Sequence, residues 1–417
     1  MSAWTAERAE EYLLSRELFG MRFGLDRMHR LMTVLGSPHR RFRSIHVVGT
    51  NGKSSTVRML AAILEAHGIR TGSYLSPHLV SFAERIRVGD ADLDEPAFGA
   101  AVERAAKASE LVDRTLGPED RVTQFEALTA AAYSELAARG VEVAAVEAGL
   151  GGRYDATSVI PSEVQVLTNV GLEHTRWLGP TIADIAREKL AVVRDGTTLV
   201  VGQLNADAQS EARAATEEHG ARLVQASPDL GVPLAARGAF QRANFALAAA
   251  AAEALLGSLD RAAVRAAGAS VQVPGRCQAI DRDPLTVVDG AHNPAGARAL
   301  AASLPELRGS APRTIAVLSV LEDKDAAGIL RELLPSCAAV VLTRSLNPRA
   351  LPPATLQSLA TQVGADPASL EVEPEPRRAL ARARELAGPE GAVLATGSIY
   401  LVADLLRPPG ARRASML

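Results

Sequence analysis

The chain has 417 residues, of which 47% are hydrophobic and 22% are charged, and its formal net charge is −3. This length favours two or three domains, and this composition is typical of a soluble globular protein, which excludes disordered, collagen-like and coiled-coil classes. The small net charge gives no basic surplus for nucleic acid, and two cysteines, Cys277 and Cys337, are too few for a disulfide framework.

The first half of the chain alternates strand and helix patterns. Residues 1–43 have apolar positions at helical spacing, and residues 1–12 are too polar for a signal peptide. Next come apolar, β-branched runs that predict strands and periodic segments that predict helices. The predicted strands are 44–48, 68–74, 141–147, 164–170, 199–201 and 222–225, and the predicted helices are 56–67, 95–114 and 123–139.

The second half begins after an alanine-rich helix predicted at 244–256. Its apolar run, residues 245–252, falls far short of the roughly 20 apolar residues that span a bilayer. Pro274-Gly275 is a break signal, and we place a domain boundary there, with domains at 1–273 and 274–417. Further strands are predicted at 285–288, 314–318, 339–343 and 392–395.

The alternation predicts an α/β fold, because strands that alternate with helices form mostly parallel sheets covered on both faces. We expect an N-terminal domain with a phosphate-binding loop and a parallel sheet flanked by helices. A smaller, Rossmann-like α/β domain follows. We expect a cytoplasmic monomer without a nucleic-acid or membrane partner.

A glycine-rich turn follows the strand at 44–48, in the segment IHVVGTNGKSS. Backbone N–H groups at the start of the next helix suit a phosphate, Lys53 can reach the terminal phosphates, and a serine hydroxyl can face Mg²⁺. The usual first glycine would fall at Val47 but comes at Gly49, so the loop is a shortened variant. The alternative is a glycine turn with a surface lysine.

Acidic and histidine side chains follow two other predicted strands. Glu147 precedes a glycine-rich turn, and Glu173-His174 follow the strand at 164–170. In open α/β sheets, ligands bind at this carboxyl edge, so these side chains are candidates for a Mg²⁺ site. Either residue alone would be interpreted as solvated or structural.

Lysine is rare in this chain. Only Lys53, Lys107, Lys189 and Lys324 are present among 45 basic residues, which suggests that lysine persists where arginine will not serve. Lys189 has no acidic residue three or four positions away with which to pair on its helix. A solvated surface position is the alternative to a specific role.

The second domain offers Asp289 and His292 after the strand at 285–288, although an aspartate before a glycine is also a common turn residue. Because each domain is expected to carry candidate residues at the carboxyl edge of its sheet, we expect ATP to bind at the interface of the two domains.

Taken together, these segments resemble the folylpolyglutamate synthase and dihydrofolate synthase family of the Mur ligases, almost from end to end. The matching segments are Phe23-Gly24-Leu25 with Arg27, 49–55, 76–79, 84–86, 125–126, 147–157, 168–174, 178–179, 188–189, Gln241 with Asn244, 274–276, 289–294, 323–325 and 396–398.

The resemblance implies roles for individual residues. It implies ATP binding by Asn51, Gly52, Lys53, Ser54 and Ser55, with further nucleotide contacts from Asn244, Arg276 and Asp289 across the cleft. It implies Mg²⁺, as two ions, bound by Ser76, Glu147 and His174. It implies catalytic roles for Lys53, Lys189 and His292, with Lys189 carbamylated. It implies pterin-substrate contacts from Thr123, Gln124, Phe125, Glu126, Tyr154, Asp155 and Ala156.

The activity implied by the resemblance is an ATP-dependent ligation of L-glutamate to dihydropteroate, to folate, or to both, through an acyl phosphate. Ser54 stands where the family commonly has glycine and is closer to other Mur ligases. The alternatives are a Mur-type ligase with a different carboxylate acceptor, a P-loop NTPase without ligation, and a nucleotide-binding module without catalysis.

Overall fold

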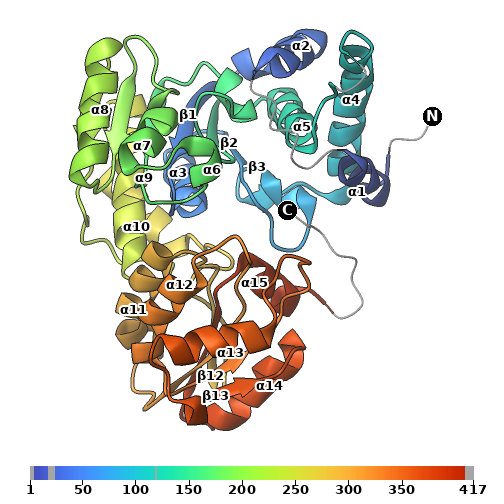
Figure 1. Ribbon diagram of the computed structural model, residues 1–417. Coiled ribbons are helices and arrows are strands. Elements are labelled where there is room, and N and C mark those ends of the chain that lie inside the picture. The colour runs from blue at the N-terminus through green and yellow to red at the C-terminus, as the bar shows by residue number, and fades with distance from the viewer. Residues whose placement is uncertain (1–3, 17–23, 118–119, 409–417) are drawn as a thin grey trace. The chain divides into compact units, whose positions relative to one another are not determined.

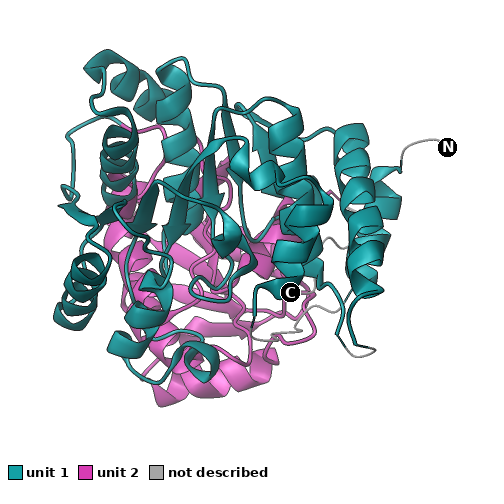
Figure 2. Cartoon of the chain, turned by 90° about the horizontal axis from the view of Figure 1, so that it is seen from above, with its two compact units in different colours: residues 1–233, 243–271, 417 teal, residues 234–242, 272–416 magenta. Residues whose placement is uncertain are grey.

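The computed structural model describes residues 4–16, 24–117 and 120–408 (Figure 1). These residues form two compact units, coloured separately in Figure 2. The first unit lies within 1–233 and 243–271, and the second within 234–242 and 272–416. Residues 234–242 belong to the second unit, whereas the expected division at 273/274 placed them in the first domain. The functions assigned to the two domains stay predictions.

The first unit is built on an eight-stranded sheet with the order β4-β3-β2-β5-β1-β6-β7-β8. The strands from β2 to β8 in this order are parallel, whereas β3 and β4 form an antiparallel edge. The strands are β1 Arg43–Val48, β2 Thr71–Tyr74, β3 Ile86–Val88, β4 Ala91–Asp92, β5 Val143–Glu147, β6 Val164–Leu167, β7 Thr198–Val201 and β8 Arg222–Gln225.

The central strands β1 and β5 are buried along almost their whole length, because helices cover both faces of the sheet. The helices are α1 Ala6–Ser15, α2 Asp26–Val34, α3 Lys53–Ala66, α4 Glu95–Asp113, α5 Gln124–Ala138, α6 Thr175–Leu178, α7 Ile182–Leu190, α8 Ala206–Glu218, α9 Phe240–Leu256 and α10 Arg261–Ser270. One core cluster packs α1, α2, α4 and α5 against the sheet, and another packs α7 and α8.

The helical segment expected at 1–43 is two helices and a short 3-10 turn, Pro38–Arg40, before β1 begins at Arg43. Residues 1–3 and 17–23, which were included in that expectation, lie outside the described residues, and so does Phe23 of the family resemblance. The long helix α9 starts at Phe240, four residues earlier than expected.

The second unit has a six-stranded sheet with the order β13-β12-β11-β14-β10-β9, parallel except for the edge strand β9. Its strands are β9 Gln278–Arg282, β10 Leu285–Val288, β11 Thr314–Leu318, β12 Ala339–Leu342, β13 Leu370–Val372 and β14 Ala392–Thr396. Its helices are α11 Pro294–Arg308, α12 Ala326–Leu333, α13 Pro353–Gln362, α14 Pro376–Ala387 and α15 Ile399–Leu406.

The α/β class, with two mostly parallel sheets flanked by helices, is confirmed. Parallel strands place their carboxyl ends at one edge, and in the first unit the segments after β1, β2, β5 and β6 meet there. None of the described helices is long and apolar enough to cross a membrane.

Candidate active site

The glycine turn after β1 leads directly into α3, with Gly52 in a left-handed conformation (φ 85°) at the helix start. A side chain there would also meet Oδ1 of Asn244, only 2.5 Å from the position of a Cβ. Glycine is therefore required at position 52 by conformation and by space. Asn244, which we expected to contact nucleotide from across the cleft, belongs to the first unit and lies against this loop.

The segment after β6 holds the loop in place. Asn51 N–H donates to Oδ1 of Asn169 at 3.0 Å, and the Asn51 carbonyl accepts from Asn169 Nδ2 at 3.0 Å and from Thr168 Oγ1 at 2.7 Å. Thr50 N–H donates to the Asn169 carbonyl at 2.9 Å. From the sequence, Thr168 and Asn169 were expected only as part of the strand at 164–170 and of the matching segment 168–174, without a role of their own.

Lys53 folds back over its own loop, where Nζ donates to the carbonyls of Gly49 at 3.0 Å and Thr50 at 3.1 Å. Its positive charge therefore stands beside the backbone N–H groups at the start of α3, an arrangement that suits an anion. Ser55, the second serine of the motif, is buried.

Glu147 ends β5 and is only 1% exposed. Its Oε1 accepts from Ser54 Oγ at 2.9 Å, and its Oε2 accepts from the N–H of Ser76 at 3.0 Å. The structure therefore brings three expected site residues together: Ser54, Ser76 and Glu147. Ser54, the departure from the family pattern, contacts this carboxylate.

His174 precedes α6 in a left-handed conformation and has an exposed side chain. No group of three or more His, Cys, Asp or Glu side chains placed to hold a metal occurs within 4–16, 24–117 and 120–408. Mg²⁺ needs fewer protein ligands, because it keeps several waters and binds substrate phosphates, so the oxygen atoms of Ser76 and Glu147 fit this ion. That His174 also binds this ion stays a prediction.

Lys189 lies near the end of α7 and is 2% exposed. Its Nζ donates to the Leu150 carbonyl at 2.6 Å, in the glycine-rich turn after Glu147. Burial, reinforced by the nearby positive charge of Lys53, lowers its pKa to about 7. Two lysines are thus gathered near the phosphate loop, where an anion would be stabilised by both. Lys107, by contrast, is exposed and pairs with Glu103, so rarity alone does not mark a functional lysine.

The two segments expected to contact pterin converge on Gly149. A Cβ at Gly149 would lie 2.9 Å from Phe125 Cζ and 3.2 Å from Asp155 Oδ2. Asp155 also accepts from the N–H groups of Gly151 at 2.9 Å and Thr157 at 3.0 Å, so it shapes the turn. Tyr154 is 47% exposed, and the buried Ala156 begins a 3-10 turn.

Other residues of these segments have structural partners. Thr123 and Glu126 form a capping box at the start of α5. Gln124 Nε2 donates to the Leu13 carbonyl at 2.9 Å, and both carboxylate oxygens of Glu126 lie 3.0 Å from Arg27 Nε. Their expected substrate contacts stay predictions.

Replacing Arg27 by methionine is expected to lower the free energy of unfolding by about 3 kcal/mol, because Glu126 would remain buried without its cation. The matched control is Arg43→Met, since Arg43 and Glu163 form an almost half-exposed pair and less than about 1 kcal/mol is expected there. Urea unfolding measures both values. Equal losses in the free energy of unfolding for the two variants would show that the buried pair stabilises the fold no more than the exposed pair does.

In the second unit, Asp289 follows β10 and is 2% exposed. Its carboxylate accepts from the N–H groups of Cys277 at 2.9 Å and Ala291 at 2.8 Å. Nδ1 of His292 lies 2.9 Å from the Gly290 carbonyl, which can only accept, so Nδ1 carries a proton. Arg276 lies beside Gly290.

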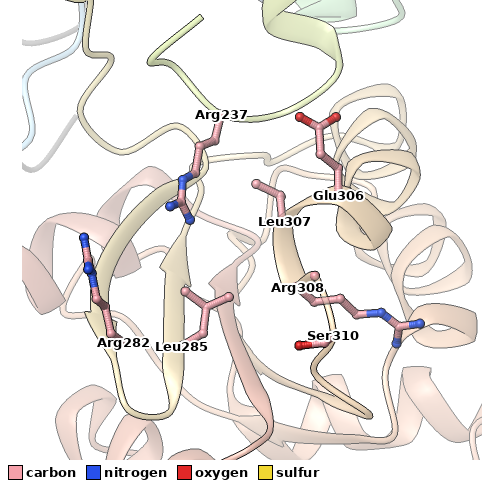
Figure 3. A pocket seen from close by; sticks show the side chains of 8 residues that line it. Arg237, Arg282, Leu285, Glu306, Leu307, Arg308 and Ser310 are labelled. Carbon is pink, nitrogen blue, oxygen red and sulfur yellow. The ribbon is translucent and has the colours of Figure 1, made fainter.

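A hollow of about 550 Å³ lies elsewhere in the second unit, between the start of β10 and the end of α11 (Figure 3). Arg237, Arg282 and Arg308 line it, but their side chains point in different directions. It lies at the amino ends of the parallel strands and contains none of the expected site residues, so it is separate from the candidate site.

Residues 47–251 match the Mur ligase middle domain, and residues 275–399 match the glutamate ligase domain of Mur ligases. The chain is 37% identical over 384 residues to the dihydrofolate synthase/folylpolyglutamate synthase of Mycobacterium tuberculosis, covering 82% of this chain and 77% of that protein.

Solved structures agree with this match. The folylpolyglutamate synthase of Mycobacterium tuberculosis complexed with ADP superposes with a TM-score of 0.89 at 33% identity, covering 96% of this chain and 97% of that one. The bifunctional folylpolyglutamate synthase/dihydrofolate synthase of Yersinia pestis, complexed with AMPPNP and a Mn ion, gives 0.83 at 27% identity, with coverages of 96% and 97%.

Proposed function

Because the chain belongs to the folylpolyglutamate synthase/dihydrofolate synthase family of Mur ligases, we propose that it joins L-glutamate to dihydropteroate, to a reduced folate, or to both. It is an ATP-dependent carboxylate–amine ligase that works with a divalent metal on small-molecule substrates. The observation that carries the proposal is the gathering of Lys53, Glu147 and Lys189 at one sheet edge beside the glycine loop.

The chemistry requires an activated carboxylate, because a carboxylate and an ammonium do not condense unaided in water. We propose that a carboxylate oxygen of the acceptor attacks the γ-phosphorus of ATP and that ADP leaves. The glutamate amine then attacks the acyl carbon, an amide forms, and phosphate leaves with the acceptor's oxygen. Lys53 and the N–H groups at the start of α3 stabilise the charge on the transferring phosphoryl group.

We assign the metal to Ser76, Glu147 and His174, as Mg²⁺ and as two ions in the active complex. When bound, Mg²⁺ neutralises phosphate charge. The chain's own contribution is to fix the Glu147 carboxylate, since Ser54 Oγ and the Ser76 N–H each donate to one of its oxygens. A carboxylate held in this way needs no rearrangement to receive a cation.

We assign to Lys189 a carbamate, formed when its neutral amine attacks carbon dioxide and releases a proton. The lowered pKa supports this, because at pH 7 about half of the side chains are neutral at a pKa of about 7. The product is an anion with oxygen donors, close to the positive charge of Lys53, and arginine does not readily form it.

Incubation with ¹³C-bicarbonate is therefore expected to give one carbamate signal in the ¹³C NMR spectrum of the wild-type protein. The signal should grow between pH 6 and pH 8, because the neutral amine becomes the major form as pH passes about 7. Lys189→Arg should abolish it, and the control Lys107→Arg, at an exposed lysine, should keep it. A signal that survives in Lys189→Arg would contradict the assignment.

The remaining roles are proposals of the same kind. Asn51, Gly52, Ser55 and Asn244 contact the nucleotide, supported by their position in or against the phosphate loop. Arg276 and Asp289 make nucleotide contacts from the second unit, and His292, whose Nδ1 is held by the Gly290 carbonyl, positions either the γ-phosphate or the incoming amine.

The acceptor's pterin ring is assigned to the surface around Phe125, Gly149 and Tyr154. Phe125 is half-buried, with its ring 6.1 Å from that of Tyr74, and Tyr154 is exposed. Aromatic side chains of this kind can stack on a flat heterocycle.

The test is phosphate release from ATP, Mg²⁺ and L-glutamate, with dihydropteroate and tetrahydrofolate supplied separately. Release with dihydropteroate alone shows dihydrofolate synthase, release with tetrahydrofolate alone shows folylpolyglutamate synthase, and release with both shows a bifunctional enzyme. Release without an acceptor would contradict ligation, and no release with either would direct the search to another carboxylate acceptor.

A further inference from the structure

Arg58 lies on α3, four residues after Ser54, and its side chain is half-buried. Among the residues that the structure describes, its guanidinium has no hydrogen bond or ion pair. The neighbouring Arg87, by contrast, contacts both Asp90 and Asp92. A half-buried cation without a partner is costly to keep, which makes Arg58 unusual in this unit.

The carboxylates whose charges act on Arg58 are Asp92, Glu84 and Glu147. Each is committed to other donors. Asp92 pairs with Arg87, and Glu147 accepts from Ser54 and Ser76. Glu84 accepts from three backbone N–H groups of the turn before it, at 2.8–2.9 Å.

The direction of the side chain follows from the helix. Residues four apart lie on the same helix face, so Arg58 shares the stripe of Ser54, whose hydroxyl contacts Glu147. Helical side chains also lean toward the N-terminus, which for α3 is the phosphate loop. The guanidinium is therefore directed toward the phosphate-loop end of α3, at the carboxyl edge of the sheet, and its charged neighbours are Arg87, Asp92, Glu84 and Glu147.

Burial and the nearby Arg87 lower the pKa of Arg58, yet arginine remains charged at any physiological pH. A fixed, partly desolvated cation at this edge is suited to an anion that arrives with the substrate. The planar fork of arginine matches a carboxylate in particular, since it can donate two parallel hydrogen bonds.

We propose that Arg58 binds one of the two carboxylates of a glutamyl acceptor, namely the carboxylate that the reaction does not phosphorylate. This inference rests on the proposed function and deepens it. Dihydropteroate has one carboxylate, and the reaction consumes it. A folate ends in glutamate with two carboxylates, of which one is activated and the other remains charged throughout. Arg58 thus distinguishes the two acceptor classes and favours chains that already carry glutamate.

The test compares the two acceptors in Arg58→Met, Arg58→Lys and the control Arg70→Met. Arg70 is exposed, lies just before β2 at the other edge of the sheet, and uses only backbone groups in its hydrogen bonds. Arg58→Met should raise KM for tetrahydrofolate about 30-fold, the loss expected for a charged hydrogen bond. For dihydropteroate, kcat/KM should fall less than about threefold.

Arg58→Lys should recover part of the tetrahydrofolate affinity, because lysine keeps the positive charge but cannot donate two parallel hydrogen bonds from a planar group. Equal losses with both acceptors, or a change confined to KM for free glutamate, would overturn the inference. A wild-type enzyme that uses dihydropteroate and no folate would overturn it while leaving the ligase function intact. A wild-type enzyme without acceptor-dependent release would overturn both.

Discussion

Replacement of Lys53 by alanine is expected to lower kcat for ATP-dependent ligation by about 10³-fold, with the fold unchanged. The ammonium stands over the loop, 3.0 Å from the Gly49 carbonyl and 3.1 Å from that of Thr50. Removing one preorganised donor from a charge-stabilising site costs about 10²–10³ in rate, and here a full positive charge is lost as well. Steady-state phosphate release measures the effect.

The matched control is Lys107→Ala, because Lys107 is an exposed lysine of the same unit that pairs with Glu103 on α4. Its activity should equal that of the wild type. Circular dichroism and thermal unfolding establish that both variants fold. A folded Lys53→Ala variant with turnover within about threefold of the wild type would contradict the role of the phosphate loop.

Glu147→Gln is the second large effect, with an expected loss of about 10²-fold in kcat and weaker binding of a divalent ion. The amide keeps the shape of the side chain, so an oxygen can still accept from the Ser76 N–H and the other position can still face Ser54 Oγ. What disappears is the negative charge that a hard cation requires. Electron paramagnetic resonance with Mn²⁺ and a non-hydrolysable ATP analogue measures ion binding directly.

Glu142→Gln serves as the control, since Glu142 is exposed just before β5, at the opposite end from Glu147, and accepts from the Arg70 N–H. It should bind Mn²⁺ as the wild type does. Unaltered Mn²⁺ binding in Glu147→Gln would remove this carboxylate from the metal site, whatever the change in turnover.

The sequence predicts most of the parallel strands of both sheets because most of them are buried apolar runs, although the short parallel strand β13 was not predicted. The antiparallel edges were not predicted. β3 and β4 are three and two residues long, and Arg87 lies in one of them, so no alternation is visible. β9 begins soon after Gly275 and is mostly exposed, which gives it a polar, loop-like sequence.

The residues of the candidate site likewise include some that the sequence reveals and others that it does not. Residues beside a glycine turn or at a strand end, such as Lys53 and Glu147, are visible because local chemistry marks them. Partners distant in sequence are not visible. Nothing near Glu126 indicates that Arg27, 99 positions away, pairs with it, and nothing near Asn51 indicates its contacts with Asn169. Arg58 could not be recognised from the sequence for a different reason, since what distinguishes it is that no residue in the described part of the chain pairs with its guanidinium.

The measurement that tests the account most directly follows one oxygen atom. Dihydropteroate or tetrahydrofolate labelled with ¹⁸O in its reacting carboxylate is turned over with ATP and L-glutamate, and the released phosphate is examined by mass spectrometry. Because the acceptor's oxygen bonds to phosphorus and leaves with it, we expect one ¹⁸O atom in each phosphate per amide formed. Amide formation with unlabelled phosphate would contradict activation of the carboxylate by phosphorylation, and with it the role assigned to this site.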